Sequence, residues 1–126
     1  KKISKIKKGI NFSQMKKINS LTSEAYKELN SNNFSLKIWG EYLNDYWFYK
    51  KQLDSSVTKK EINEIYKKAI DCGAYGGKLL GAGGGGFMMF LCNKSSKRKI
   101  SNIFKHRILD NIKFSYSGSK VIINNF

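Results

Sequence analysis

The spacing of apolar positions predicts helices in the first half of the chain. Residues 11–29 carry apolar side chains every three or four positions, which is the spacing of one helical face. Residues 36–53 repeat this pattern with a stripe that includes Trp39 and Trp47. Aromatic stripes at helical spacing belong more often to a core than to a cofactor site. Both segments are therefore predicted to be helices that pack through these stripes.

Two further helices are predicted with signals at their ends. Thr58 and Glu61 have the spacing of a capping box, and Gly73 stands where a left-handed glycine commonly ends a helix. A fourth helix is predicted to follow Ser95 or Ser96. We expect its apolar positions to be buried: Ile100, Ile103, Phe104 and Ile108.

Short apolar runs in the second half of the chain predict strands. Residues 78–80 and 87–91 are too short for helices and flank a glycine tract. Residues 114–123 contain two more apolar segments around a Ser117-Gly118 turn, which is typical of a hairpin. Because short connections join adjacent strands, the predicted class is α+β, with helices packed on one face of a roughly four-stranded antiparallel sheet.

Composition is that of one globular domain without a membrane segment. The 126 residues are 40% hydrophobic and 13% aromatic, which is enough for one core. No apolar run approaches the roughly 20 residues of a membrane-spanning helix. Cys72 and Cys92 fit neither a disulfide framework nor a zinc site, which favours the cytoplasm. We expect residues 1–126 to form a single domain, and the start at Lys1 is typical of a piece of a longer chain.

The net charge of +15 raises the question of an anionic partner. Lysine and arginine neutralise nucleic-acid phosphates, so one alternative is a stand-alone basic domain that binds nucleic acid. However, the arginines that read bases are limited to Arg98 and Arg107, and the abundant Lys, Asn and Ile all have A/T-rich codons. We therefore favour a solvated lysine surface and do not expect nucleic acid as a partner. Another alternative is a regulatory domain that binds a small ligand without catalysis.

Most of the chain's 11 glycines fall in residues 73–86, and four are consecutive at 83–86. An interior glycine costs about 0.5–1 kcal/mol relative to alanine, so the cluster needs a physical reason. Consecutive amides in such a loop can form an anion-binding concavity. The dinucleotide fingerprint does not apply, because a strand follows the tract, and Lys78 lacks the Ser or Thr of a P-loop. A loop that faces phosphate or substrate is favoured over a plain strand connection.

Residues 78–87, Lys-Leu-Leu-Gly-Ala-Gly-Gly-Gly-Gly-Phe, resemble the third motif of the GHMP small-molecule kinases. Leu80 stands where many members carry threonine. The Leu-Leu pair, Trp47 with Lys50-Lys51, and the closing segment 114–122 are most similar to the heptose 7-phosphate kinase branch. The resemblance covers roughly residues 36–123.

This resemblance implies a ferredoxin-like C-terminal domain of an ATP-dependent sugar or sugar-phosphate kinase. An N-terminal domain, absent from this chain, is expected to bind most of the ATP and Mg²⁺ and to carry the catalytic groups. No catalytic residue or metal ligand is therefore expected here. The resemblance implies that the substrate and phosphate cleft is lined by Lys78, Gly81, Ala82, Gly83, Gly84, Gly85 and Gly86. The acceptor class implied is a heptose phosphate used for nucleotide-sugar or polysaccharide precursors.

Several polar residues near the tract are weaker candidates. Lys78 is either a phosphate contact or a strand residue that faces solvent. Asp71 and Glu64 have no spacing that indicates a catalytic base, and His106 lies within a helical pattern. Lys50 and Lys51 end the tryptophan-bearing helix, where solvation is favoured over contact with a sugar phosphate. We expect the two acids and the two helix-end lysines to be solvated, and the histidine to be either exposed or satisfied by a hydrogen bond rather than catalytic.

Overall fold

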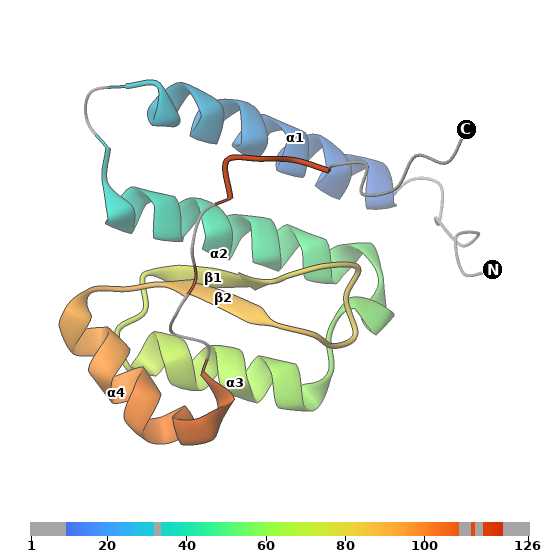
Figure 1. Cartoon of the computed structure of the whole chain (residues 1–126). Helices are drawn as coiled ribbons and strands as arrows, with labels where there is room; N and C mark the ends of the chain where they lie inside the picture. Colours follow the sequence, from blue (N-terminus) through green and yellow to red (C-terminus); the bar gives the residue numbers. More distant parts are fainter. Residues whose placement is uncertain (1–9, 32–33, 109–111, 113–114, 120–126) are drawn as a thin grey trace, which may run out of the picture.

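A computed structural model describes residues 10–31, 34–108, 112 and 115–119 of the chain (Figure 1). Figure 1 shows α1 and α2 side by side, with a β-hairpin between α2 and α3 and with α4 beside α3. The elements in chain order are α1 (Ile10–Leu29), α2 (Leu36–Leu53), η1 (Ser55–Val57), α3 (Lys60–Asp71), β1 (Gly76–Leu79), β2 (Met88–Leu91), α4 (Lys94–Phe104) and η2 (Lys105–Arg107). Here η denotes a single turn of 3-10 helix. The predicted helices and the first two strands are confirmed.

The strands β1 and β2 pair in antiparallel fashion, with Gly76 opposite Leu91 and Leu79 opposite Met88. The α+β class is therefore confirmed. Within the described residues the sheet has two strands, so a four-stranded sheet is not found there. Of the hairpin expected at 114–123, residues 115–119 carry no strand, and the other positions lie outside the described residues.

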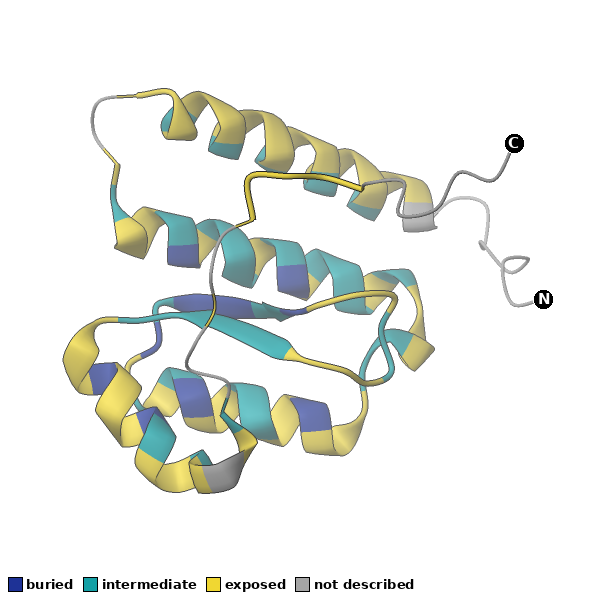
Figure 2. Ribbon diagram, in the orientation of Figure 1, coloured by how far each residue is buried: buried dark blue, intermediate teal, exposed yellow. Residues whose placement is uncertain are grey.

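The core consists of two clusters that join the helices to the hairpin. Trp47 of α2, Ile62 of α3 and Leu79 of β1 form the first cluster. The second cluster centres on Ala69, Ala74 and Ile100, with Phe90 and Phe104 packed against it. In Figure 2 most of the buried residues lie where α2, β1 and α3 face one another, with others on α4, whereas α1 is exposed along most of its surface. The hairpin is thus held by α2 through the first cluster and by α3 and α4 through the second.

Of the two predicted ends of α3, the C-terminal one is confirmed and the N-terminal one is wrong. Gly73 ends the helix with φ +93°, and its N–H donates to the Ile70 carbonyl at 2.8 Å, as expected for a glycine stop. The capping box is wrong, because α3 begins at Lys60 and its N-cap residue, Lys59, makes no side-chain cap. The Thr58 hydroxyl lies one residue before the N-cap and instead bonds to the Asn63 side chain at 3.1 Å.

The helix α4 begins slightly earlier than predicted and buries a narrower face. The Asn93 side chain caps it by accepting from the Ser96 N–H at 2.8 Å, so the helix starts at Lys94. Ile100 is buried, but Ile103 is 51% exposed, so its predicted burial is wrong. The buried stripe follows the i and i+4 positions Ile100 and Phe104, which leaves the i+3 side chain outside the contact.

A close backbone contact between α2 and β1 determines where the strand lies. A Cβ atom on Gly76 would lie 1.8 Å from the Gly40 carbonyl oxygen, so only glycine fits at this approach. The Asn44 side chain of α2 donates to the Tyr75 carbonyl at 3.0 Å, directly before the strand. These contacts place the start of β1 beside the first half of α2. Among the described helices, none combines the length and apolar character that crossing a bilayer requires.

Candidate functional site

The glycine tract forms the loop between β1 and β2. Its base is closed by a hydrogen bond from the Leu80 N–H to the Phe87 carbonyl at 2.8 Å. Residues other than glycine rarely adopt a positive φ, and four glycines of this loop have one. The values are +84° at Gly81, +114° at Gly83, +76° at Gly84 and +111° at Gly86. The backbone path itself therefore accounts for most of the glycines.

One side of the loop rests on the backbone of η1. The Gly84 N–H donates to the Val57 carbonyl at 2.9 Å. A Cβ atom on Gly83 would lie 2.9 Å from the Val57 Cα, so this close approach also requires glycine. Gly85 differs from both, because its φ is not positive and a Cβ atom there would meet no protein atom within 4 Å. The fold alone therefore gives no reason for glycine at position 85.

Several amides of the loop are available to a ligand. Within the described part of the chain, the N–H groups of Ala82, Gly83, Gly85 and Gly86 have no protein acceptor. Ala82, Gly85 and Gly86 are exposed as residues, so these donors lie at the surface. Consecutive unpaired amides of this kind attract the oxygens of anions.

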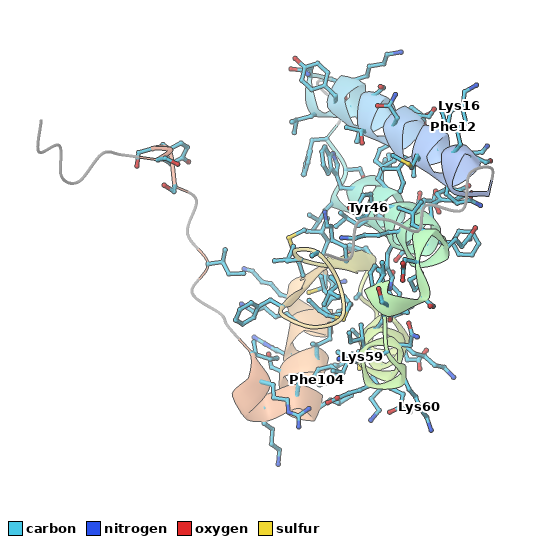
Figure 3. All side chains as sticks on the ribbon, turned by 90° about the vertical axis from the view of Figure 1, so that its right-hand side faces the viewer. Phe12, Lys16, Tyr46, Lys59, Lys60 and Phe104 are labelled. Atoms are coloured by element: carbon cyan, nitrogen blue, oxygen red, sulfur yellow. The ribbon has the colours of Figure 1, made fainter. Side chains whose placement is uncertain are left out.

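Two lysines place positive charge at the start of the loop. The Lys78 Nζ lies 4.2 Å from the centroid of the Tyr46 ring, and the Lys50 Nζ lies 5.7 Å from the same centroid. Figure 3 looks toward the loop end of the molecule and labels Tyr46 on α2. Among the described residues, neither ammonium has a carboxylate within 4.0 Å. In the part of the chain that the structure describes, neither charge is therefore neutralised by an ion pair.

The structure corrects the expectation that the lysines at the end of α2 are solvated. Lys50 donates from Nζ to the Gly81 carbonyl at 2.8 Å and is only half-exposed. Lys51 instead lies over the rings of Trp47 and Tyr66, with Nζ 5.7 Å and 5.9 Å from their centroids. Thirty-one positions separate Lys50 from Gly81 along the chain. A contact between residues so far apart in the chain cannot be predicted from a local sequence pattern.

A polar link below the loop joins three elements of the fold. The Tyr66 hydroxyl of α3 donates to the Asn44 side-chain oxygen of α2, and Asn44 donates in turn to the Tyr75 carbonyl before β1. Burial raises the pKa of the Tyr66 phenol above its ordinary value of 10.0, and the charge of Asp45 acts in the same direction. A hydrogen bond from the Gly77 backbone opposes this, but burial prevails.

Tyr66 should make the folded state lose stability in alkaline solution. Because its pKa is raised, the folded protein holds the phenolic proton more tightly than the unfolded chain does. This contribution is complete below about pH 10 and is lost as the pH rises through the folded-state pKa. The free energies of unfolding of the wild-type and Tyr66→Phe proteins, measured in urea, should therefore approach each other above about pH 10. A difference that stays constant between about pH 9 and 11 would contradict this assignment.

The remaining candidates lie apart from the loop or show no activating environment. Asp71 and Glu64 are exposed, as expected. Glu64 lines a shallow depression of about 490 Å³ between α3 and α4, and no residue of the glycine loop lines it. The side chain of His106 lies outside the described part of the structure. Asp71 and Glu64 therefore add no group to the loop site.

The cysteines and carboxylates offer no obvious chemistry of their own. Cys72 and Cys92 are free thiols, and burial raises the pKa of Cys92 although the charge of Lys97 opposes this. A thiol that stays protonated is a poor nucleophile. In the described ranges, no three His, Cys, Asp or Glu side chains gather where they could hold a metal ion. The donors that the loop region does offer are N–H and ammonium groups, which suit anionic oxygens and not Mg²⁺.

Comparison with known proteins finds a matching family and a relative that is similar over part of the chain. A segment of 51 residues is 49% identical to the D-glycero-alpha-D-manno-heptose 7-phosphate kinase of Campylobacter jejuni subsp. jejuni serotype O:2. This match covers 40% of the present chain and 15% of the relative, so the chain corresponds to a small part of that protein. Residues 20–108 match the family described as GHMP kinases C terminal, over both core clusters and the glycine loop. The chain belongs to this family of GHMP kinase C-terminal domains.

Proposed function

We propose that this chain forms one wall of the active site of an ATP-dependent kinase that phosphorylates a sugar or sugar phosphate. The family membership supports a kinase. The name of the Campylobacter jejuni relative favours a heptose phosphate as the acceptor class. In this proposal residues 1–126 belong to one domain, which acts in the cytoplasm on precursors of nucleotide sugars or polysaccharides.

The loop residues line the phosphate-facing side of the cleft. The proposed set is Lys78, Gly81, Ala82, Gly83, Gly84, Gly85 and Gly86. Phosphoryl transfer depends mainly on positioning and on stabilising charge at the phosphate oxygens. Unpaired loop amides and the ammonium of Lys78 supply donors for those oxygens without any covalent step on the protein.

Gly85 is the observation that carries this assignment. The other glycines of residues 83–86 are explained by positive φ or by contact with η1, but Gly85 has neither reason. A glycine with open space around its Cβ position is expected where a ligand must approach the backbone closely. The phosphate group of a substrate or of ATP has the charge and size to use this approach.

The proposal divides the catalytic groups between two domains. A separate N-terminal domain binds most of the nucleotide and Mg²⁺ and carries the group that assists the acceptor hydroxyl. When bound there, Mg²⁺ neutralises charge on the transferring phosphate. The present chain contributes amides and ammonium groups that orient the anionic substrate, and it holds neither the metal nor the catalytic base.

Activity should therefore require more than this chain. The chain alone should show no turnover with ATP, Mg²⁺ and heptose 7-phosphate in a coupled assay for ADP release. Fused to the part of the Campylobacter jejuni relative that precedes its matched segment, the chain should support ATP-dependent phosphorylation. The matched control is the same fusion carrying Gly85→Val. Turnover by the chain alone, or equal turnover in the two fusions, would refute the proposed division of roles.

A further inference from the structure

The glycine loop is held at three places within the described residues. Its base is closed by Leu80 and Phe87, and its middle is tied to Val57 through the Gly84 N–H. Both of these hydrogen bonds join backbone atoms. The third joins the Lys50 ammonium to the Gly81 carbonyl at 2.8 Å. Lys50 therefore provides the anchor that comes from a side chain.

This anchor determines the direction of one peptide group. The described chain has no cis peptide bonds, so the Gly81–Ala82 peptide is trans and planar, with its C=O and N–H pointing in opposite directions. Because the Gly81 carbonyl points to Lys50 on α2, the Ala82 N–H points away from α2. Apart from the adjoining residues, no protein atom lies within 4 Å of the Cβ position of Gly81, so no packing on that side of Gly81 opposes the direction set by this hydrogen bond.

The ammonium of Lys50 is itself restrained. It lies 5.7 Å from the centroid of the Tyr46 ring, which also receives Lys78 at 4.2 Å. An aromatic face attracts a cation, and a charged donor makes a stronger hydrogen bond than a neutral donor. Tyr46 thus attracts both ammonium groups, and that of Lys50 also bonds to the loop carbonyl.

We propose that Lys50 is a positioning residue of the proposed phosphoryl-transfer site. By holding the Gly81 carbonyl toward α2, it presents the Ala82 N–H to a phosphate oxygen of the ligand. This inference rests on the proposed function, because it requires that the loop bind phosphate. It assigns Lys50 no contact with the reacting atoms.

The test uses the whole chain labelled with ¹⁵N and inorganic phosphate as the probe. Lys50→Met removes the donor, and Lys51→Met removes the same charge one residue away, where the ammonium contacts Trp47 and Tyr66 instead. Lys50→Arg restores a charged donor. Lys50→Leu, which also lacks a donor, replaces Lys50→Met if circular dichroism shows that the methionine variant is unfolded.

Without phosphate, the Ala82 amide should change its chemical shift in Lys50→Met but not in Lys51→Met. With phosphate, the loop amides of the wild-type protein should shift. The dissociation constant should rise about tenfold in Lys50→Met and less than about twofold in Lys51→Met, as expected for a lost charged hydrogen bond. Lys50→Arg should recover most of the affinity.

The possible failures separate the two proposals. If phosphate shifts no loop amide of the wild-type protein, the proposed phosphate-binding role of the loop is wrong. If phosphate binds but the Ala82 amide is unchanged in Lys50→Met, the positioning role is wrong. If the two methionine variants weaken binding equally, net charge explains the effect and the positioning role is again wrong.

Discussion

Gly85→Val should lower kcat/KM of a kinase containing this chain by at least about 100-fold, an effect comparable to losing a donor that stabilises a transition state. The reason is steric and lies with the ligand. A Cβ atom at position 85 meets no protein atom within 4 Å, so the valine side chain occupies space that the proposed phosphate needs. The thermal midpoint of the isolated chain should stay unchanged. The measurements are steady-state kinetics of the fusion described above and thermal unfolding of the chain.

Gly83→Ala is the matched variant for this experiment. Its Cβ atom would lie 2.9 Å from the Val57 Cα, and its φ of +114° is unfavourable for alanine. This change should therefore lower both activity and the thermal midpoint. Wild-type turnover in Gly85→Val would show that the loop does not line the ligand cleft. A lowered thermal midpoint in Gly85→Val would show that the fold itself requires this glycine.

Trp47→Ala should lower the free energy of unfolding by about 3–5 kcal/mol, the usual cost of removing a large buried aromatic side chain. Trp47 is 1% exposed and lies in the first core cluster with Ile62 and Leu79. Its loss leaves a cavity where α2, α3 and β1 meet. Because domains are commonly stable by about 5–15 kcal/mol, this variant should be near the limit of folding. Urea unfolding followed by circular dichroism measures the change.

Phe48→Ala is the control on the same helix. Phe48 is the next residue, but it is 56% exposed, so its replacement should cost less than about 1 kcal/mol. Trp47→Phe should fall between the two alanine variants, since it keeps an aromatic ring in the core. The indole N–H of Trp47 has no acceptor among the described residues, so this substitution sacrifices no hydrogen bond. Equal losses for Trp47→Ala and Phe48→Ala would contradict the assigned core.

Periodicity predicted the helices because burial of one face imposes a spacing that can be read locally. The stripe of residues 36–53 includes Trp47, which is fully buried in α2. The same pattern overestimated burial in α4, where Ile103 is exposed. Periodicity shows which residues share a face, but the width of the buried face depends on the neighbouring elements. That width is a property of the assembled fold.

The sequence by itself determined the order of the helices, the first two strands, the glycine stop at Gly73 and the place of the glycine loop. These features depend on local spacing and on the conformational freedom of glycine. Tertiary structure alone decided that Lys50 binds the Gly81 carbonyl and that Gly83 touches Val57. It also separated Gly85 from its neighbours as the glycine without a structural reason. Such contacts depend on how α2 and η1 lie against the hairpin, and core packing between residues distant in sequence determines that arrangement.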